Sequence, residues 1–249
     1  MRDRFSTTAA FVTIAAVSTA LAAGTGHAQP GGGMGATPIA VDLKKVPVGS
    51  WSAYQVAVGE QKGKAHWALV DRTSDHVTVE MAMEGGPTQM MGGKMTIQMQ
   101  LAPDPTTAAK PVQKVVMQPE GKDPMVMPSE APNPKFEKPD PKKLVGKETV
   151  KVPAGSFPTK HYRSSEDRGV VDMWLTETVS PLGMVKMTVT PKAGSPVPPV
   201  SLELTEQGKD AKSVITKAPK PFDPAALMGP GAHGGMHPPA APPPAAPAK

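Results

Sequence analysis

Paired methionines are the residues of this sequence best suited to holding a soft metal ion. Met81 and Met83 stand two positions apart, as do Met125 and Met127. Thioether sulfur is a soft ligand that suits Cu(I). Residues two apart on a strand point to the same face, so each pair equally describes a core lined with methionine. We expect the core role for both pairs.

A second metal candidate lies near the C-terminus. His233, Met236 and His237 place two imidazoles and a thioether in a segment otherwise made of small residues and proline. These ligands suit copper, but ordering such a segment costs conformational entropy, so we expect weak binding. Apart from this candidate metal site, the sequence predicts no cofactor.

A hydrolytic site is the third chemical possibility. His161 precedes two serines and two acids at residues 164–167, but none of the serines stands in a nucleophile-elbow motif. Neighbours along one strand do not converge as a catalytic triad must. We therefore expect no catalytic residues and no enzymatic activity.

Aromatic and methionine side chains could instead line a cavity for an apolar ligand, or simply fill the core. Aromatic rings dominate burial energetics in either role. The sequence does not separate the two roles, and both remain open. The candidates for the cavity are Tyr54, Trp67, Met81, Met83, Met99 and Trp174.

The elements that would position these side chains are strands. Residues 51–58, 66–70, 77–83 and 95–101 alternate apolar with polar or small side chains, which is typical of half-buried strands. Between residues 50 and 217 no stretch has convincing helical periodicity. Just before this region, residues 41–46 could form a single helical turn.

Two Pro-x-Gly turns, Pro153-Ala154-Gly155 and Pro181-Leu182-Gly183, punctuate the second half of the chain. Proline presets the first turn residue and glycine accepts a left-handed backbone, so each turn predicts a three-residue hairpin loop with a bulge. A sheet of nine or ten strands must curl or close. We predict an all-β or mainly β fold, built as a large, curved antiparallel sheet: a half-barrel meander.

The flanks of this domain differ from it in composition. Residues 1–28 begin with two arginines, continue with an apolar stretch and end in small residues, which predicts a cleaved signal peptide and a periplasmic or secreted protein. A Gly-rich lead at 29–39, a β domain at 40–217 with a Pro-rich loop at 128–141, and a disordered Pro/Ala-rich tail at 218–249 follow. We expect no transmembrane segment in the mature chain.

The absence of cysteine excludes disulfides, thiolate metal sites and a lipid-modified cysteine, so we expect a protein that is not lipidated. The formal charge of +5 becomes +4 once the signal is removed. Lysine and arginine are interleaved with acids and form no basic stripe, so nucleic acid is not an expected partner.

Residues 144–190 resemble a known family. The stretch from Gly146 to Phe157, then Trp174, then the stretch from Ser180 to Lys186 are similar to periplasmic half-barrel proteins of the lipoprotein-carrier (LolA/LolB-like) superfamily. The resemblance implies a curved antiparallel sheet whose apolar concave face can hold acyl chains. It transfers no catalytic or binding residue to this chain.

Three functional hypotheses follow. The first is a non-enzymatic exported protein that binds a lipid-like or apolar molecule on its curved sheet. The second is a structural or protein-interaction module of the cell envelope, whose sheet edges recruit an envelope protein by strand addition. The third is a periplasmic copper-binding protein that uses the His/Met tail.

Overall fold

The protein is nearly all β in its computed structural model, which describes residues 37–91, 93–128, 136–166, 169–196 and 198–223. Two short 3-10 turns, η2 (Gly86–Met91) and η3 (Pro141–Lys143), are the only helical elements in these ranges. Within the same ranges, no helix is long and apolar enough to cross a membrane.

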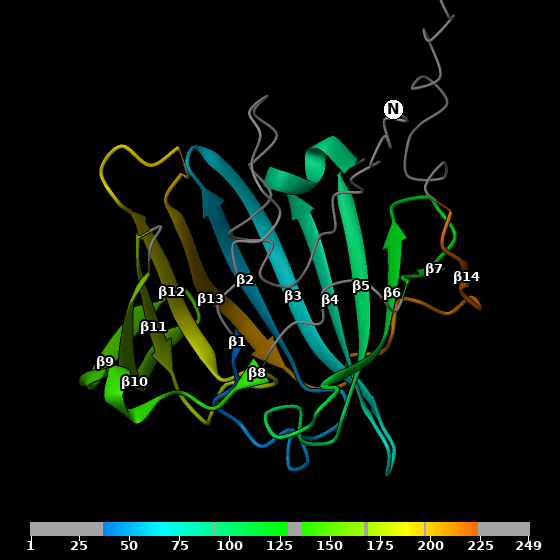
Figure 1. The fold of residues 1–249 in the computed structure, drawn as a ribbon, viewed down its shortest axis with the longest axis horizontal. Helices are drawn as coiled ribbons and strands as arrows, with labels where there is room; N and C mark the ends of the chain where they lie inside the picture. The colour runs from blue at the N-terminus through cyan, green and yellow to red at the C-terminus, as the bar shows by residue number, and fades with distance from the viewer. Residues whose placement is uncertain (1–36, 92, 129–135, 167–168, 197, 224–249) are drawn as a thin grey trace, which may run out of the picture.

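Twelve strands form one open, mixed sheet, shown in Figure 1. Its order is β14-β7-β6-β5-β4-β3-β2-β13-β12-β11-β10-β9, and β14–β7 is its one parallel pair in the described part. A separate parallel pair joins β1 and β8. The bounds are β1 Thr37–Pro38, β2 Trp51–Val58, β3 Gln61–Arg72, β4 Val77–Gly85, β5 Lys94–Leu101, β6 Val112–Pro119, β7 Met125–Val126, β8 Phe136–Glu137, β9 Leu144–Val152, β10 Gly155–Glu166, β11 Gly169–Leu175, β12 Met184–Pro191, β13 Val200–Gly208 and β14 Lys220–Pro221.

The predicted large antiparallel sheet is confirmed, with more strands than the nine or ten expected. Strand β13 pairs with β2, so the last long strand joins the two halves of the chain. In Figure 1, β2–β7 lie to one side of this junction and β9–β12 to the other. The sheet ends in β9 and β14, which do not pair with each other.

One face of the sheet carries the core, as the alternation predicts. Cross-strand registers align Leu202 with Val56, and Trp67 with Met81 and then Ile97. All five side chains are buried. Because side chains alternate along a strand, the residues between them point to the opposite face, here called the outer face.

The two Pro-x-Gly turns differ from the expected three-residue loops. Val152 pairs with Gly155, so the first hairpin closes on two residues. The second connection is longer, covering residues 176–183, and is closed by a 2.8 Å hydrogen bond from the Thr176 amide to the Gly183 carbonyl. Gly183 has a φ of +80°, and an added Cβ would lie 2.7 Å from the Ala40 Cβ. Glycine is needed there for both conformation and space.

The sheet curls most strongly at its β9 end. The amide of Ala154, at the tip of the β9–β10 hairpin, donates a 3.1 Å hydrogen bond to the carbonyl of Leu204 on β13. Strand β9 also contacts β12 and β13 without pairing with either. The five strands from β13 to β9 therefore form a partly closed barrel, which confirms the curved half-barrel class.

The segment between β13 and β14, residues 209–219, crosses the outer face and is here called the C-terminal strap. Its two ends lie on β13 and beside β7, so it spans β2 to β6. The buried Glu80 of β4 accepts hydrogen bonds from Ser213 Oγ (2.7 Å) and the Val214 amide (3.0 Å). Alternation had predicted a wet outer face here, but the strap covers Glu80.

The inner ends of the predicted flanks contribute to the described structure. Thr37–Pro38 form β1, and Ile39 belongs to the core cluster. Within the Pro-rich stretch, Phe136–Glu137 form β8, and beyond residue 217 Lys220–Pro221 form β14. The predicted turn at residues 41–46 exists as a single hydrogen-bonded turn, with the Val46 amide donating to the Asp42 carbonyl (3.3 Å). The predicted signal peptide lies outside the described residues.

Candidate functional site

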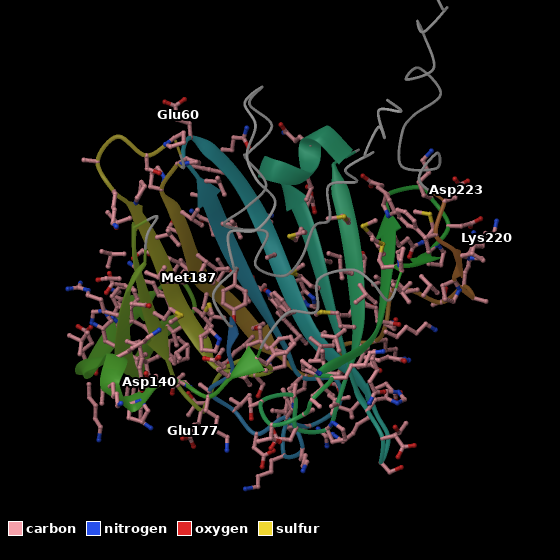
Figure 2. All side chains as sticks on the ribbon, viewed as in Figure 1. Glu60, Asp140, Glu177, Met187, Lys220 and Asp223 are labelled. Atoms are coloured by element: carbon pink, nitrogen blue, oxygen red, sulfur yellow. The ribbon has the colours of Figure 1, made fainter. Side chains whose placement is uncertain are left out.

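The candidate site is a groove of about 1340 Å³. It lies against the β9–β10 side of the sheet, and its walls come from segments that are far apart in the sequence. Figure 2 places Glu177, one of its lining residues, at the lower end of the molecule. The lining residues are 39–47, 103–106, 138–139, 141, 147–149, 158–160 and 175–178, with Tyr162 and Ser180.

The N-terminal wall of the groove is held in place by backbone and guanidinium hydrogen bonds. Arg72 Nη2 donates to the carbonyl of Leu43 (2.8 Å) and to that of Val46. The amide of Ile39 donates to Glu137 (2.9 Å), and the amide of Ala40 donates to Leu182 (3.2 Å). This wall is therefore preorganised rather than dependent on a ligand for its position.

The floor of the groove is apolar. Leu43, Leu175 and Tyr162 line it and also belong to the buried core cluster. Six prolines add stiff apolar surface without exposing amide donors, since proline has none. These prolines are Pro47, Pro103, Pro105, Pro139, Pro141 and Pro158.

The rim of the groove is charged. Its lysines are Lys44, Lys45, Lys138, Lys147 and Lys160, and its carboxylates are Asp42, Asp104, Glu148 and Glu177. Lys45 Nζ lies 3.6 Å from Asp42 Oδ2. Hydrogen bonds from Thr106 are the largest cause that lowers the pKa of Asp104, with Lys138 adding to the effect.

A polar network lies beside the groove on the opposite side of β10. His161 Nδ1 is 3.1 Å from Glu148 Oε1, and its Nε2 is 2.6 Å from Asp172 Oδ1. Arg163 Nε donates to the same Asp172 oxygen at 2.8 Å. The registers of β9, β10 and β11 place these side chains on one face.

Trp174 closes the network from β11. Its ring stacks on His161 with centroids 4.5 Å apart and planes at 15°, and its Nε1 donates to Glu148 Oε1 at 2.6 Å. Lys186 Nζ lies 5.6 Å from the Trp174 ring centroid and 2.7 Å from Glu203 Oε1. A cation over an indole face adds an attraction to this stack.

The network binds its own members rather than presenting a free base. Burial disfavours the charged form of Asp172, but the hydrogen bonds from Arg163 and His161 outweigh it and lower the pKa of this carboxyl. Both ring nitrogens of His161 face carboxylates. A general base needs a nitrogen within reach of a substrate proton, which this arrangement does not offer.

The structure separates the six predicted cavity residues from the groove, since none of them lines it. Tyr54, Trp67, Met81 and Met99 are buried in the core cluster, with exposed fractions of 2%, 6%, 1% and 2%. The Tyr54 hydroxyl donates to the Met184 carbonyl at 2.9 Å, and burial raises the pKa of this phenol. Met83 packs on the same cluster. Trp174 belongs to the His161 network.

The metal candidates have different outcomes. Met81 and Met125 are buried in the sheet, and Met83 and Met127 pack against the core cluster. In the described ranges, no group of three or more His, Asp or Glu side chains could hold a metal ion. His233, Met236 and His237 lie outside the described residues, so copper binding by the tail stays a prediction.

Sequence reasoning missed the His161 network because its members come from three strands whose register was not predicted. Ser164 points to the other face of β10, where its Oγ accepts a 3.1 Å hydrogen bond from Lys143 Nζ. The residues that do meet His161 come from neighbouring strands. Pairing the two predicted hairpins in register would have found Trp174, which lies directly opposite His161.

No protein-family model matches the sequence, and no curated protein matches it. Solved structures similar to this one include a hypothetical protein of Chlamydia trachomatis (TM-score 0.45, 12% identity, covering 72% of this chain and 96% of that one). A Bacteroides fragilis protein described as a putative exported protein with a YmcC-like fold has a TM-score of 0.36 and 12% sequence identity. The match covers 66% of this chain and 97% of that one. MucB has a TM-score of 0.35 and 13% sequence identity, and the match covers 70% of this chain and 57% of that one. At these values the similarities assign neither a family nor an activity.

Proposed function

We propose that this chain is an exported, non-enzymatic binding protein that holds the apolar part of a lipid-like molecule in the groove. The observation that carries the proposal is the groove itself, about 1340 Å³ with an apolar floor and a charged rim. Ligand sites are commonly about 300–1,000 Å³ and lined mainly by apolar groups, with a few polar ones that fix orientation. This groove has the room and the chemistry for a long amphiphile.

The preorganised N-terminal wall supports binding. Arg72 fixes two carbonyls of this wall, so a ligand would meet a shaped surface and would not have to order a loop first. The apolar floor favours burial of an acyl chain at about 25 cal/mol per Å². Export rests on the signal-like residues 1–28, and N-terminal sequencing of protein from the cell envelope would test cleavage after Ala28.

The non-enzymatic part of the proposal is supported by the His161 network. His161 is the histidine best placed for acid–base chemistry near the groove, and both of its nitrogens already face carboxylates. Its nearest serine in sequence, Ser164, points to the other face of the strand. Glu148 is the network member that lines the groove, and it is already engaged by His161 and Trp174.

Filling the groove with a bulky side chain tests whether the groove binds an acyl chain. Thr149 is an exposed residue on β9 that lines the groove, and Thr149→Trp would occupy its mouth without disturbing the core. We expect binding of a fluorescent acyl-chain probe to weaken at least tenfold, because a bulky ring excludes the chain. The matched control is Ser156→Trp, which changes an exposed residue on the adjacent strand, outside the groove.

Two results would contradict the proposal. One is wild-type protein that binds no acyl-chain probe and also yields no lipid when organic extracts of natively purified protein are examined by mass spectrometry. The other is a Thr149→Trp protein that binds as tightly as the Ser156→Trp control. Circular dichroism spectra of both variants should match the wild type, which confirms that the sheet is intact.

A second candidate function rests on the edge strand β9. It spans nine residues, and Leu144 and Val145 are 39% and 56% exposed. A long edge with exposed apolar side chains can pair with a strand from another protein. Val145→Pro should then abolish crosslinking of a defined envelope partner in cells while leaving acyl-chain binding unchanged; unchanged crosslinking would exclude this role.

A further inference from the structure

Two lysines face each other across the β9–β10 pair at the rim of the groove. Lys147 and Lys160 are direct register partners, both are exposed, and both line the groove. Directly opposite residues of an antiparallel pair share one face, with Cβ atoms about 4.5–5.5 Å apart. The two lysine side chains therefore start from neighbouring points on one face, so both ammonium groups can reach one bound anion.

This arrangement costs stability and is not compensated inside the described part of the protein. Like charges directly opposite each other on a sheet are destabilising. No ion pair or side-chain hydrogen bond of either ammonium group occurs in the described ranges. An anion placed between them would remove the repulsion.

The carboxylates that line the groove are mostly engaged elsewhere. Asp42 pairs with Lys45, and Glu148 accepts from Trp174 and lies against His161. Asp104 accepts hydrogen bonds from the Thr106 amide and hydroxyl. Glu177 is the remaining lining carboxylate, and it comes from the loop after β11, whereas the lysine pair is on β9–β10.

The lysine pair adjoins the apolar floor. Lys160 is the register partner of Leu175, which is 1% exposed and lines the groove. Tyr162, two residues along β10, shares the same face as Lys160 and also lines the groove. Cationic and apolar side chains therefore meet on one face of the adjacent strands β9, β10 and β11, which is the pattern that an anionic amphiphile would match.

We propose that Lys147 and Lys160 bind the anionic headgroup of a phospholipid whose acyl chain lies in the groove. This inference rests on the proposed function and specifies its ligand class. Ammonium groups bind phosphate as point charges and do not require the planar geometry of arginine. The lysine pair gives the site its preference for a net negative headgroup, and the floor accounts for the affinity for the chain.

The test compares two probes with the same acyl chain below their critical micelle concentrations. Lysophosphatidylglycerol has a net negative headgroup, whereas lysophosphatidylcholine is zwitterionic. We expect wild-type protein to bind the former about tenfold more tightly, and Lys147→Gln/Lys160→Gln to bind both equally. The control pair Lys64→Gln/Lys151→Gln removes the same charge from exposed lysines outside the groove and should keep the preference.

Stability provides an independent readout of the same variants. Removing the like-charge pair should leave the unfolding midpoint unchanged or raise it, so weaker binding of lysophosphatidylglycerol would not come from unfolding. Raising the salt concentration should weaken the wild-type preference, because exposed charges are screened.

The outcomes separate the inference from the proposed function. If both probes bind wild-type protein equally and the lysine variant changes nothing, the headgroup inference fails while the groove proposal stands. If neither probe binds, the proposed function itself fails. If inorganic phosphate alone competes fully at equal concentration, the site is a phosphate site and the phospholipid inference is overturned.

Discussion

His161 lies between two carboxylates and is stacked on an indole ring. Its Nε2 is hydrogen-bonded to Asp172, its Nδ1 lies 3.1 Å from Glu148, and these partners come from the two strands that flank β10. The network therefore belongs to the stability of the curl at the β9 end. Hydrogen bonds such as that from Arg163 to Asp172 involve charged groups and are stronger than hydrogen bonds between neutral groups.

Asp172→Asn tests this role. The pKa of Asp172 is lowered in the folded protein, mainly by hydrogen bonds from Arg163 and His161 that outweigh burial, so its ionised form stabilises the fold. That stabilisation is present above the unfolded-state pKa of about 3.9 and is lost as pH falls through the lower folded value. We expect the variant to lose about 1.5–3 kcal/mol at pH 7 and less at pH 3.

Urea unfolding of wild type and variant across this pH range measures the difference. Asp210→Asn is a suitable control, because Asp210 is exposed and its φ of +72° also suits asparagine. A difference between wild type and Asp172→Asn that is constant from pH 7 to pH 3 would show that the carboxylate charge does not matter.

At the scale of elements, the C-terminal strap is the least expected part of the fold. Besides the two donors from the strap, Glu80 accepts from Gln98 Nε2 at 3.3 Å. Trp51 Nε1 donates to the Lys209 carbonyl at 3.1 Å, and Lys217 and Lys220 both pair with Asp123 at the far end. Figure 2 shows Lys220 at the β14 edge of the molecule. The strap thus ties β13 to β7 and β14 across the outer face of the β2–β6 strands.

Glu80→Ala should release the middle of the strap. The change leaves partly buried donors of Ser213, Val214 and Gln98 without this acceptor, at a cost of about 1 kcal/mol. Limited proteolysis should then cut within residues 209–219 sooner than in the wild type. Glu84→Ala is the matched control, since Glu84 is exposed, lies on the same strand and face, and is paired in register with Lys64 and Lys94. Equal cutting rates in both variants would contradict the anchoring role of Glu80.

The sequence predicted the strands that bury one face in the core. It did not predict the segments whose positions depend on contacts between distant parts of the chain. Residues 77–83 and 95–101 alternate because their apolar side chains meet in the core. The strap has no periodicity of its own, and its position depends on the pairing of β13 with β2, which brings distant strands together. The length of the loop at residues 176–183 was not predicted correctly. This loop packs against residues 40 and 41, and a local turn motif carries no information about such distant contacts.

At the scale of the whole molecule, alternation identifies the residues of a concave face but does not say whether that face is filled. Tyr54, Trp67, Met81 and Met99 were candidates for a cavity and are core. The groove is instead built by loops and strand ends from segments distant in sequence, so no local pattern could reveal it. The register of β9 and β10 places Lys147 opposite Lys160, and the sequence alone did not predict this pairing.

The position of a bound acyl chain tests the central proposal most directly. Amide chemical shifts of the processed protein should be followed by NMR while lysophosphatidylglycerol is added. We expect the largest shifts at residues 39–47, 147–149, 158–160 and 175–178, which line the groove. Large shifts confined to strands β3–β5 around Trp67 and Met99, or no shifts at saturating lipid, would contradict it.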